Sequence, residues 1–282
     1  MLKKEKDDRF EKNDSLRVLM VGDVVGKPGR DVVIRRMRDI RETYEIDFVV
    51  CNAENAAGGS GITPEIYNAI VQAGVDCVTL GDHAFRQKSF LPVLRSNDQR
   101  VVRPANLPSE APGRGWTILE APATEKRPAV KIGVAALLGR VFMQTQGDNP
   151  LAAADKLLEK FADVRARFLD FHAEATSETQ IMGRYLDGRF SAVLGTHTHV
   201  ATADEQIFPN GTAFQCDVGM TGPFESVIGR KIDSVVENFR TSLPTSFDVA
   251  SGDARLNGTI VDVDPALGKA RAIRRLNFGI DD

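Results

Sequence analysis

The four histidines of this 282-residue chain stand at the ends of short apolar segments whose patterns predict β-strands. Other predicted strands end in acidic residues or asparagine. In open α/β sheets, ligands bind beyond the carboxyl ends of the strands, so these end residues are expected to meet in one site. They are Asp23, Glu54, Asn55, Asp82, His83, His172, His197 and His199.

A metal centre is the chemistry that this set favours. Singly, each residue has a structural interpretation: Asp23 can cap the next helix, and Asp82 can close a turn. Together they indicate metal binding, and imidazole with carboxylate suits Zn, Mn or Fe, whereas Mg and Ca prefer oxygen ligands. His197 and His199 point to opposite faces of an extended chain. Either the chain turns there, or each histidine serves one of two ions about 3.5 to 4 Å apart.

Apolar runs alternate with helix-length amphipathic segments from Leu16 onward, which is the pattern of an α/β fold. The predicted strands cover residues 16–23, 47–54, 77–82, 131–138, 168–174 and 192–198. The predicted helices cover residues 29–43, 64–74, 87–96, 151–166 and 178–188. Thr63 before Pro64 predicts a capped helix start.

The pattern changes after residue 200 to strand and turn signals. Turns are predicted at Asn210-Gly211, near Asn257-Gly258 and near Gly268, which indicates antiparallel hairpins. A parallel first half and an antiparallel second half suggest two sheets packed face to face and covered by helices. We expect one domain over residues 16–282, preceded by a charged, mobile tail over residues 1–15.

Composition excludes several classes of protein. A net charge of −3 and a pI near 5.9 argue against a broad basic surface for duplex nucleic acid or anionic membranes. The charged amino terminus cannot form a signal peptide, and no apolar run approaches the roughly 20 residues of a membrane span. A cytoplasmic protein is therefore expected. Cys51, Cys77 and Cys216 show no CxxC spacing and are predicted to be buried, reduced thiols.

Six segments of the chain resemble motifs of the calcineurin-like metallophosphoesterase superfamily, and specifically its YmdB-like branch. The segments are GDVVGKPGR, NAENAAGGSGIT, GDHAF, FHAEATSE, GTHTHV and DVGMTGP, in the expected order between about residues 16 and 278. The resemblance implies a four-layer α-β-β-α sandwich, in which helices flank two mixed β-sheets. That fold agrees with the two packed sheets predicted from the strand pattern.

The resemblance also implies roles for the residues at the strand ends. One metal would be held by Asp23, Glu54, Asn55 and His199. The other would be held by Glu54, Asp82, His172 and His197, with Glu54 bridging the two ions. His83 would remain free as the proton donor. Most of the superfamily has Asp-x-His in the first motif, and the Asp23-Val24-Val25 sequence and Glu54 point instead to the YmdB-like branch.

One residue departs from the pattern of that branch. The third motif of the family reads Gly-Asn-His, whereas this chain has Gly81-Asp82-His83. The protein would then supply three negative charges, from Asp23, Glu54 and Asp82, against four positive charges of two divalent ions. Metal binding should tighten, and Lewis acidity toward phosphate should weaken.

The implied activity is hydrolysis of phosphate diesters, with 2',3'-cyclic nucleotides as the expected small substrates. A metal-bridging hydroxide would attack phosphorus, and His83 would protonate the leaving alkoxide. Two alternatives stay open: a phosphomonoesterase or nucleotidase with the same metals, and a nucleotide-binding regulatory protein with low turnover. The glycine-rich loop over residues 57–61 can present amides to a phosphate or form a tight turn. A homo-oligomer is a generic expectation.

Overall fold

The first sheet is built around β1 (Leu16–Val21), whose six residues are all buried. The computed structural model describes residues 12–145 and 147–281. Parallel strands extend this sheet on one side: β3 (Phe48–Asn52), β4 (Cys77–Thr79) and β5 (Val101–Val102). On its other side lie β13 (Gly252–Val263), β12 (Met220–Glu225) and β2 (Asp23–Val24), and β14 (Ala270–Gly279) also pairs with β13.

The second sheet has six strands in the order β10-β11-β9-β8-β7-β6. Its parallel centre consists of β7 (Val130–Leu138), β8 (Ala166–His172), β9 (Ala192–Thr196) and β11 (Ala213–Gln215). Antiparallel strands form its edges: β6 (Trp116–Ala121) and β10 (Gln206–Ile207). Both sheets are therefore mixed: antiparallel strands lie at both edges of the second sheet, whereas in the first the antiparallel pairings of β13 lie on one side of the parallel group.

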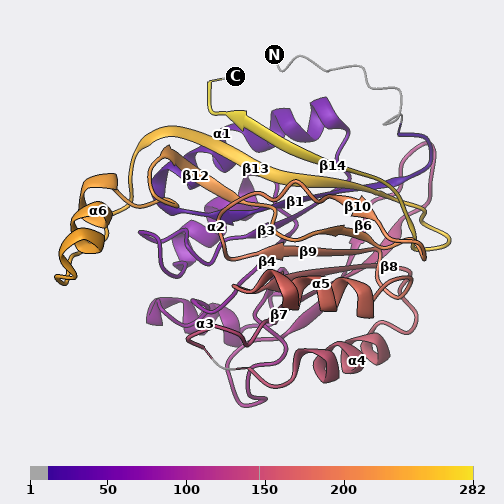
Figure 1. The fold of residues 1–282 in the computed structure, drawn as a ribbon. Coiled ribbons are helices and arrows are strands. Elements are labelled where there is room, and N and C mark those ends of the chain that lie inside the picture. Colours follow the sequence, from indigo (N-terminus) through magenta and orange to yellow (C-terminus); the bar gives the residue numbers. More distant parts are fainter. Residues whose placement is uncertain (1–11, 146, 282) are drawn as a thin grey trace.

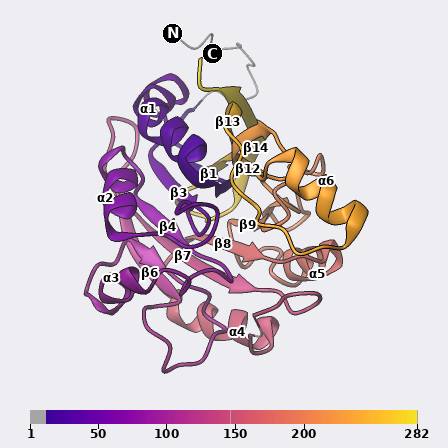
Figure 2. The same ribbon diagram turned by 90° about the vertical axis from the view of Figure 1, so that its left-hand side faces the viewer.

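Helices cover the outer faces of the two sheets, and the result is four layers (Figures 1 and 2). Over the first sheet lie α1 (Gly26–Tyr44), α2 (Pro64–Gln72), the 3₁₀ helix η2 (Lys88–Phe90) and α3 (Leu91–Arg95). Over the second lie α4 (Pro150–Lys160) and α5 (Thr176–Tyr185). Between the sheets, Val18 and Met20 of β1 pack with Phe168 of β8. The predicted α-β-β-α sandwich is confirmed.

The predicted start of α2 agrees with the structure, whereas the predicted end of α4 does not. Thr63 accepts a hydrogen bond from the Ile66 amide at 3.4 Å, ahead of Pro64 at the first position of α2. The helix predicted over residues 151–166 ends at Lys160. Phe161, which follows it, is fully buried in the core beneath the second sheet, and β8 begins at Ala166. The helix therefore ends six residues earlier than predicted, where the chain turns inward to bury this ring.

The turn predicted near Asn257-Gly258 is wrong, because β13 runs straight through both residues. This part of β13 lies between β1 and β14. A Cβ atom on Gly258 would lie 2.7 Å from the Met20 carbonyl oxygen, and the Asn257 amide donates to the Met220 carbonyl oxygen at 3.0 Å. Asn257-Gly258 therefore allows β13 to pack closely against its neighbours β1 and β12. The turns predicted at Asn210-Gly211 and Gly268 are present, between β10 and β11 and between β13 and β14.

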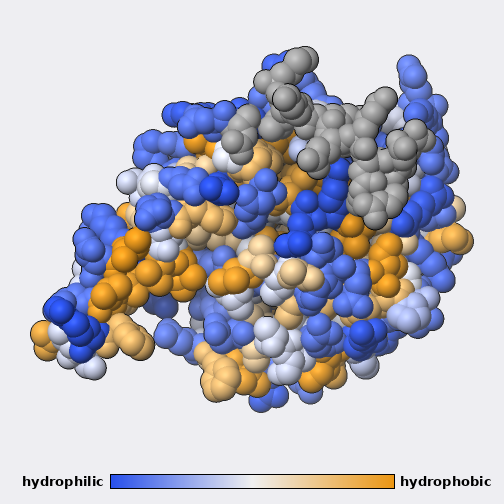
Figure 3. Space-filling view, turned by 45° about the horizontal axis from the view of Figure 1, so that its top comes forward, coloured by the Kyte–Doolittle hydropathy of each residue, from blue (hydrophilic) through white to orange (hydrophobic). Residues whose placement is uncertain are grey.

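One helix that the sequence pattern did not predict, α6 (Ile232–Thr241), projects from the body of the molecule (Figure 1). None of its residues is buried against the described part of the chain. Apolar side chains gather on this projection (Figure 3), among them Val236 and Phe239, whose exposed fractions are 53% and 91%. This is the largest difference between the predicted and observed elements.

The amino-terminal region is only partly described. Of the predicted tail, residues 1–11 lie outside the described residues. Lys12 forms an ion pair with Asp47 at 2.7 Å, and Asp14 forms one with Arg271 at 2.5 Å. All three cysteines are buried free thiols, as predicted. Among the described residues, no helix is long and apolar enough to cross a membrane.

Candidate metal centre

The carboxyl ends of the parallel strands in both sheets bring the predicted residues to one edge of the sandwich. Glu54 follows β3 and Asp82 follows β4 in the first sheet. His172 is the last residue of β8, and His197 follows β9 directly in the second sheet. The packing of the two sheets therefore brings Glu54 and Asp82 of the first sheet next to His172 and His197 of the second.

Four of these side chains form a compact cluster. His172 Nε2 lies 3.1 Å from Glu54 Oε1 and 3.2 Å from Asp82 Oδ1. The Nδ1 atom of His197 lies 3.0 Å from the same His172 nitrogen. One donor atom from each of the four residues lies within 4.8 Å of all the others, so the set can hold a metal ion. Two imidazoles with two carboxylates suit Zn, Mn or Fe.

Charges within the metal-free cluster are strongly coupled. Burial alone would raise the pKa of Glu54, but His172 and His83 beside it hold that pKa well below its usual range. Burial alone would lower the pKa of His172, and the neighbouring Glu54 and Asp82 raise it well above its usual value. Burial, with His172 nearby, lowers the pKa of His197 to about 4. A proton on His172 therefore supplies the positive charge that a metal ion would supply beside Glu54 and Asp82.

Asp23 lies behind this cluster and is fully buried. Its Oδ2 atom accepts a hydrogen bond from the His197 amide at 2.9 Å. Its Oδ1 atom has no hydrogen-bond partner among the described residues and lies 4.0 Å from His172 Nδ1. Burial raises the pKa of Asp23 to about 7. A buried oxygen without a partner is costly, and a bound cation would remove that cost.

Asn55 and His199 meet beside the cluster, with 3.3 Å between Asn55 Nδ2 and His199 Nε2. The amide oxygen of Asn55 faces His83 instead, 2.8 Å from its Nδ1 atom. The other ring nitrogen of His199 donates to the Ile228 carbonyl oxygen at 3.0 Å. For Asn55 to offer oxygen to an ion beside His199, its amide must turn over.

A turn after β9 sends the two histidines of the His197-Thr198-His199 segment to different neighbours. Both histidines have left-handed backbones, with φ values of 106° and 63°. Asp217 holds this turn, because its Oδ2 atom accepts hydrogen bonds of 2.8 Å from both the amide and the hydroxyl of Thr198. Its Oδ1 atom accepts from the Gly219 amide at 2.7 Å. The chain therefore turns here, which is one of the two alternatives that the sequence left open, and the two histidines contact different neighbours.

Sequence reasoning identified the DVGMTGP segment as one of six family motifs and did not single out Asp217. The signal was present, because Asp217 follows the apolar run AFQC at a strand end, like the other acidic residues of the site. The Asp217 side chain is fully buried, and burial raises its pKa to about 7. Asp217 therefore positions the turn over residues 197–199 from within the core.

His83 lies at the rim of the cluster with 24% of its side chain exposed. Its amide donates to Glu54 Oε2 at 3.0 Å, and its Nε2 atom lies 3.9 Å from Asp82 Oδ2. Burial alone would lower the pKa of His83, but the hydrogen bond to Glu54 and the charge of Asp82 raise it. This histidine can carry a proton at neutral pH while remaining open to solvent.

The glycine-rich loop over residues 57–61 mostly uses its own amides. The amides of Ala57, Gly59 and Ser60 donate to carbonyl oxygens within residues 55–61. The Arg230 guanidinium donates to the Gly59 carbonyl oxygen at 2.6 Å and to that of Gly58 at 3.3 Å. These contacts favour the interpretation of the loop as a tight turn.

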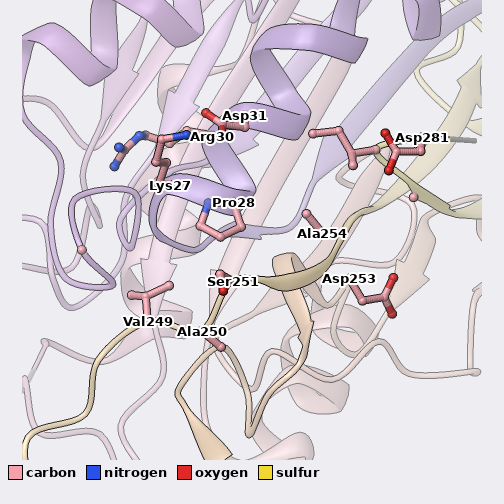
Figure 4. A pocket seen from close by; sticks show the side chains of 13 residues that line it. Lys27, Pro28, Arg30, Asp31, Val249, Ala250, Ser251, Asp253, Ala254 and Asp281 are labelled. Carbon is pink, nitrogen blue, oxygen red and sulfur yellow. Dashed lines mark hydrogen bonds and ion pairs between the residues drawn. The ribbon is translucent and has the colours of Figure 1, made fainter.

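A cavity of about 850 Å³ lies on the other side of this loop, between the start of α1 and the ends of β13 and β14 (Figure 4). It shares Gly58 with the loop but contains none of the clustered histidines or carboxylates. Lys27 at its edge is paired with Asp31, and the Arg30 guanidinium donates to the Ala56 carbonyl oxygen at 2.5 Å. These two cationic side chains are thus engaged with the protein itself.

Helices outside two mixed sheets, with histidines and carboxylates gathered at the strand ends, define a phosphoesterase of the calcineurin-like class. A crystal structure described as a novel phosphatase from Mycoplasma pneumoniae superposes with a TM-score of 0.86 at 33% identity, covering 95% of this chain and 94% of that one. The NAD nucleotidase of Haemophilus influenzae has a TM-score of 0.58 at 14% identity, covering 94% of this chain and 56% of that one, and shows the shared fold alone.

Within that class, the chain belongs to the YmdB-like protein family, whose model matches residues 19–276. The 2',3'-cyclic-nucleotide 2'-phosphodiesterase of Bacillus subtilis (strain 168) is 42% identical over 267 residues, which is 94% of this chain and 98% of that protein. A hypothetical protein from Thermus thermophilus has a TM-score of 0.85 at 40% identity, over 93% of this chain and 99% of that one. The resemblance identified from the six motifs is confirmed.

Proposed function

We propose that this protein is a metal-dependent phosphodiesterase that hydrolyses small phosphate diesters, with 2',3'-cyclic nucleotides as its substrates. The observation that carries the proposal is the convergence of Glu54, Asp82, His172 and His197, whose donor atoms lie within 4.8 Å of one another. The name of the Bacillus subtilis relative supplies the substrate class. All four side chains reach the proposed site from the same edge of the sandwich.

Two ions of Fe, Mn or Zn would be held at this edge. Glu54, Asp82, His172 and His197 would hold one ion; Asp23, Glu54, Asn55 and His199 would hold the other. The free Oδ1 atom of Asp23 and the pair of imidazole nitrogens 3.0 Å apart both fit a cation. When bound, such ions make water nucleophilic near neutral pH and neutralise charge on the phosphate.

His83 would supply the proton that the leaving oxygen needs. Glu54 and Asp82 raise its pKa, which favours the protonated ring, and its partial exposure leaves it accessible to a substrate. The contacts with Asn55 and Glu54 hold the ring at the rim of the cluster, beside the proposed metal ligands. An alkoxide leaves poorly without a proton, so this position suits a general acid.

A phosphomonoesterase remains the second candidate, because the Mycoplasma pneumoniae structure is described as a phosphatase. The two activities separate in parallel assays on a diester and a monoester with the same leaving group. A preference for the diester supports the phosphodiesterase. A preference for the monoester supports the phosphatase and leaves the metal centre unchanged.

The test of the proposal combines metal analysis with hydrolysis of 2',3'-cyclic AMP. Protein purified without chelator should contain about two metal ions per chain. Its turnover should be abolished by chelation and restored by Mn²⁺. Bound nucleotide with no turnover in the metal-loaded protein would favour a regulatory binding protein. A chain that takes up no metal would contradict the proposal.

We also propose that residues 16–282 form a single domain and that the protein works in the cytoplasm, with no stable binding of duplex nucleic acid. The three buried free thiols suit a reducing compartment, and the net charge of −3 disfavours a broad surface for nucleic acid. A homo-oligomer is proposed on general grounds. Sedimentation of the purified protein measures the assembly directly.

A further inference from the structure

Asp170, in the middle of β8, lies beneath the metal-binding cluster and is 2% exposed. Its carboxylate accepts three hydrogen bonds. The Thr196 hydroxyl donates to Oδ1 at 2.6 Å, while the Thr79 hydroxyl and the Asn52 amide donate to Oδ2 at 2.5 and 3.0 Å. No other charged side chain is among these partners, so a buried charge is held by neutral donors from three strands.

These three donors come from the strands that carry the proposed metal ligands. Asn52 ends β3, ahead of Glu54, and its own Oδ1 atom accepts from the Glu54 amide at 3.2 Å. Thr79 ends β4, ahead of Asp82, and Thr196 ends β9, directly ahead of His197. Asp170 itself lies two residues before His172. Asp170 thus ties both sheets together immediately below the cluster.

The contact between Thr196 and His172 gives this arrangement a chemical consequence. Thr196 Oγ1 lies 2.8 Å from His172 Nδ1. A threonine hydroxyl has one proton, and here that proton goes to the Asp170 carboxylate. The same oxygen must therefore accept a proton from His172 Nδ1. His172 is left with Nε2 facing Glu54 and Asp82, which is the nitrogen that a metal needs.

We propose that Asp170 is a positioning residue that acts through Thr196 to fix the ring orientation and tautomer of His172. This inference rests on the proposed metal-dependent function. Metal-binding histidines commonly donate their second ring nitrogen to a carboxylate or carbonyl partner, and loss of that partner costs about 10- to 100-fold in metal affinity or activity. In this protein a threonine hydroxyl stands between the histidine and the carboxylate.

The test is a metal titration of the metal-free protein, read as dissociation constants and stoichiometry for Zn²⁺. Thr196→Val keeps the side-chain shape but removes the hydroxyl, and we expect about 10- to 100-fold weaker binding of one of the two ions. Thr196→Ser retains the hydroxyl and should restore the affinity. Asp170→Asn should weaken the same ion.

Thr212→Val is a matched control at the opposite end of the second sheet. Thr212 is fully buried, and its hydroxyl donates to the Phe190 carbonyl oxygen at 2.6 Å. Its substitution removes an equivalent buried hydrogen bond far from the cluster. Thr212 precedes Ala213, which pairs with the first residue of β9, whereas Thr196 is the last residue of that strand. It should lower the melting temperature without changing either metal dissociation constant.

Several results would overturn the inference. Thr196→Val with wild-type metal affinity, Thr196→Ser as weak as Thr196→Val, Asp170→Asn with unchanged affinity, or Thr212→Val with weakened affinity would each do so. Failure of the wild-type protein to bind Zn²⁺ would instead contradict the proposed function. The two failures are therefore distinguishable.

A measurement on the wild-type protein covers the case in which the variants do not fold. Long-range ¹H–¹⁵N correlation spectra of the Zn²⁺-loaded protein report which ring nitrogen of each histidine carries a proton. For His172 we expect a protonated Nδ1 and a metal-shifted Nε2. The opposite assignment would overturn the inference without any substitution.

Discussion

The two groups of donors at the strand edge differ in how they are held before any ion binds. Glu54, Asp82, His172 and His197 already converge, and an Asp170-Thr196 pair supports His172 from below. On the other side, Asn55 turns its amide nitrogen toward His199. Burial also raises the pKa of Asp23, which belongs to this second group. Both groups lose a proton when an ion binds, from His172 in one and from Asp23 in the other, but only the group around Asp23 must also reorient an amide.

Preorganisation lowers the cost of binding, because fewer side chains must be ordered when the ion arrives. The converged group should therefore bind its ion more tightly than the group around Asp23. Two dissociation constants should be resolved in a titration, rather than one. Substitutions in the two groups, and the pH dependence of stability, test this difference.

The largest effect is expected for His172→Ala, which removes the central donor of the converged group. Metal affinity of that group should fall more than about 100-fold, beyond the range for an outer partner alone. His199→Ala is the matched control and should weaken only the other ion. Metal content after dialysis measures both. Equal loss from the two variants would contradict the difference between the groups.

His83→Ala should lower turnover of 2',3'-cyclic AMP by about 100-fold or more, which is the range of general acid catalysis. Both ions should remain bound, because His83 lies at the rim and contacts the ligands only through its amide and ring edge. Steady-state kinetics with parallel metal analysis make the measurement. Loss of metal would show that His83 is a ligand.

The contribution of Asp23 to the stability of the metal-free protein should fall as pH rises from about 5 to 8. The pKa of Asp23 is about 7 in the folded protein, whereas an unfolded aspartate has a pKa of about 3.9. Between those values the folded chain binds the extra proton, so rising pH favours unfolding. His172, with its raised pKa, loses its stabilising proton at still higher pH.

Relative to Asp23→Asn, the metal-free wild type should therefore lose several degrees of melting temperature across this range. Saturating Zn²⁺ should oppose the trend, because the metal competes with the protons on Asp23 and His172. Thermal melts of both proteins at matched ionic strength measure the difference. A difference that does not change with pH would contradict the raised pKa of Asp23.

The smallest effect is expected for Asp82→Asn, which restores the amide that the family motif carries. One negative charge is removed from the converged group. Turnover should rise up to about tenfold, or about 1.4 kcal/mol in the barrier, or the ion beside His172 should bind less tightly. Asp233→Asn, on the exposed helix α6, is a control for the loss of one surface charge. No change in either quantity would defeat the charge argument.

Much of the site was predictable because strand ends are local features. Apolar runs followed by Asp, Glu or His identify Asp23, Glu54, Asp82, His172 and His197 without any knowledge of packing. Asp170 was not predictable in this way, since an aspartate inside the strand FLDFH has no local reason to be buried. Its partners Asn52, Thr79 and Thr196 come from three other strands.

The same division applies to the fold. Local hydrophobic periodicity determined β1 and α1, since each element shows its own repeat. Asn257-Gly258 predicted a turn and formed a strand, because β1 and β14 enclose it on both sides. The exposed helix α6 was not predicted.

By itself, the sequence predicted a set of residues suited to metal chemistry and their positions at strand ends, because both follow from residue type and local period. Only the tertiary structure decided which of them meet. The pairing of β8 with β9 in the second sheet set the 3.0 Å approach of His172 and His197, and the packing of the two sheets brought Glu54 and Asp82 to them. Asp217 held the turn that separates His197 from His199. Contacts between distant segments have no local code, so they arise only when the whole core is assembled.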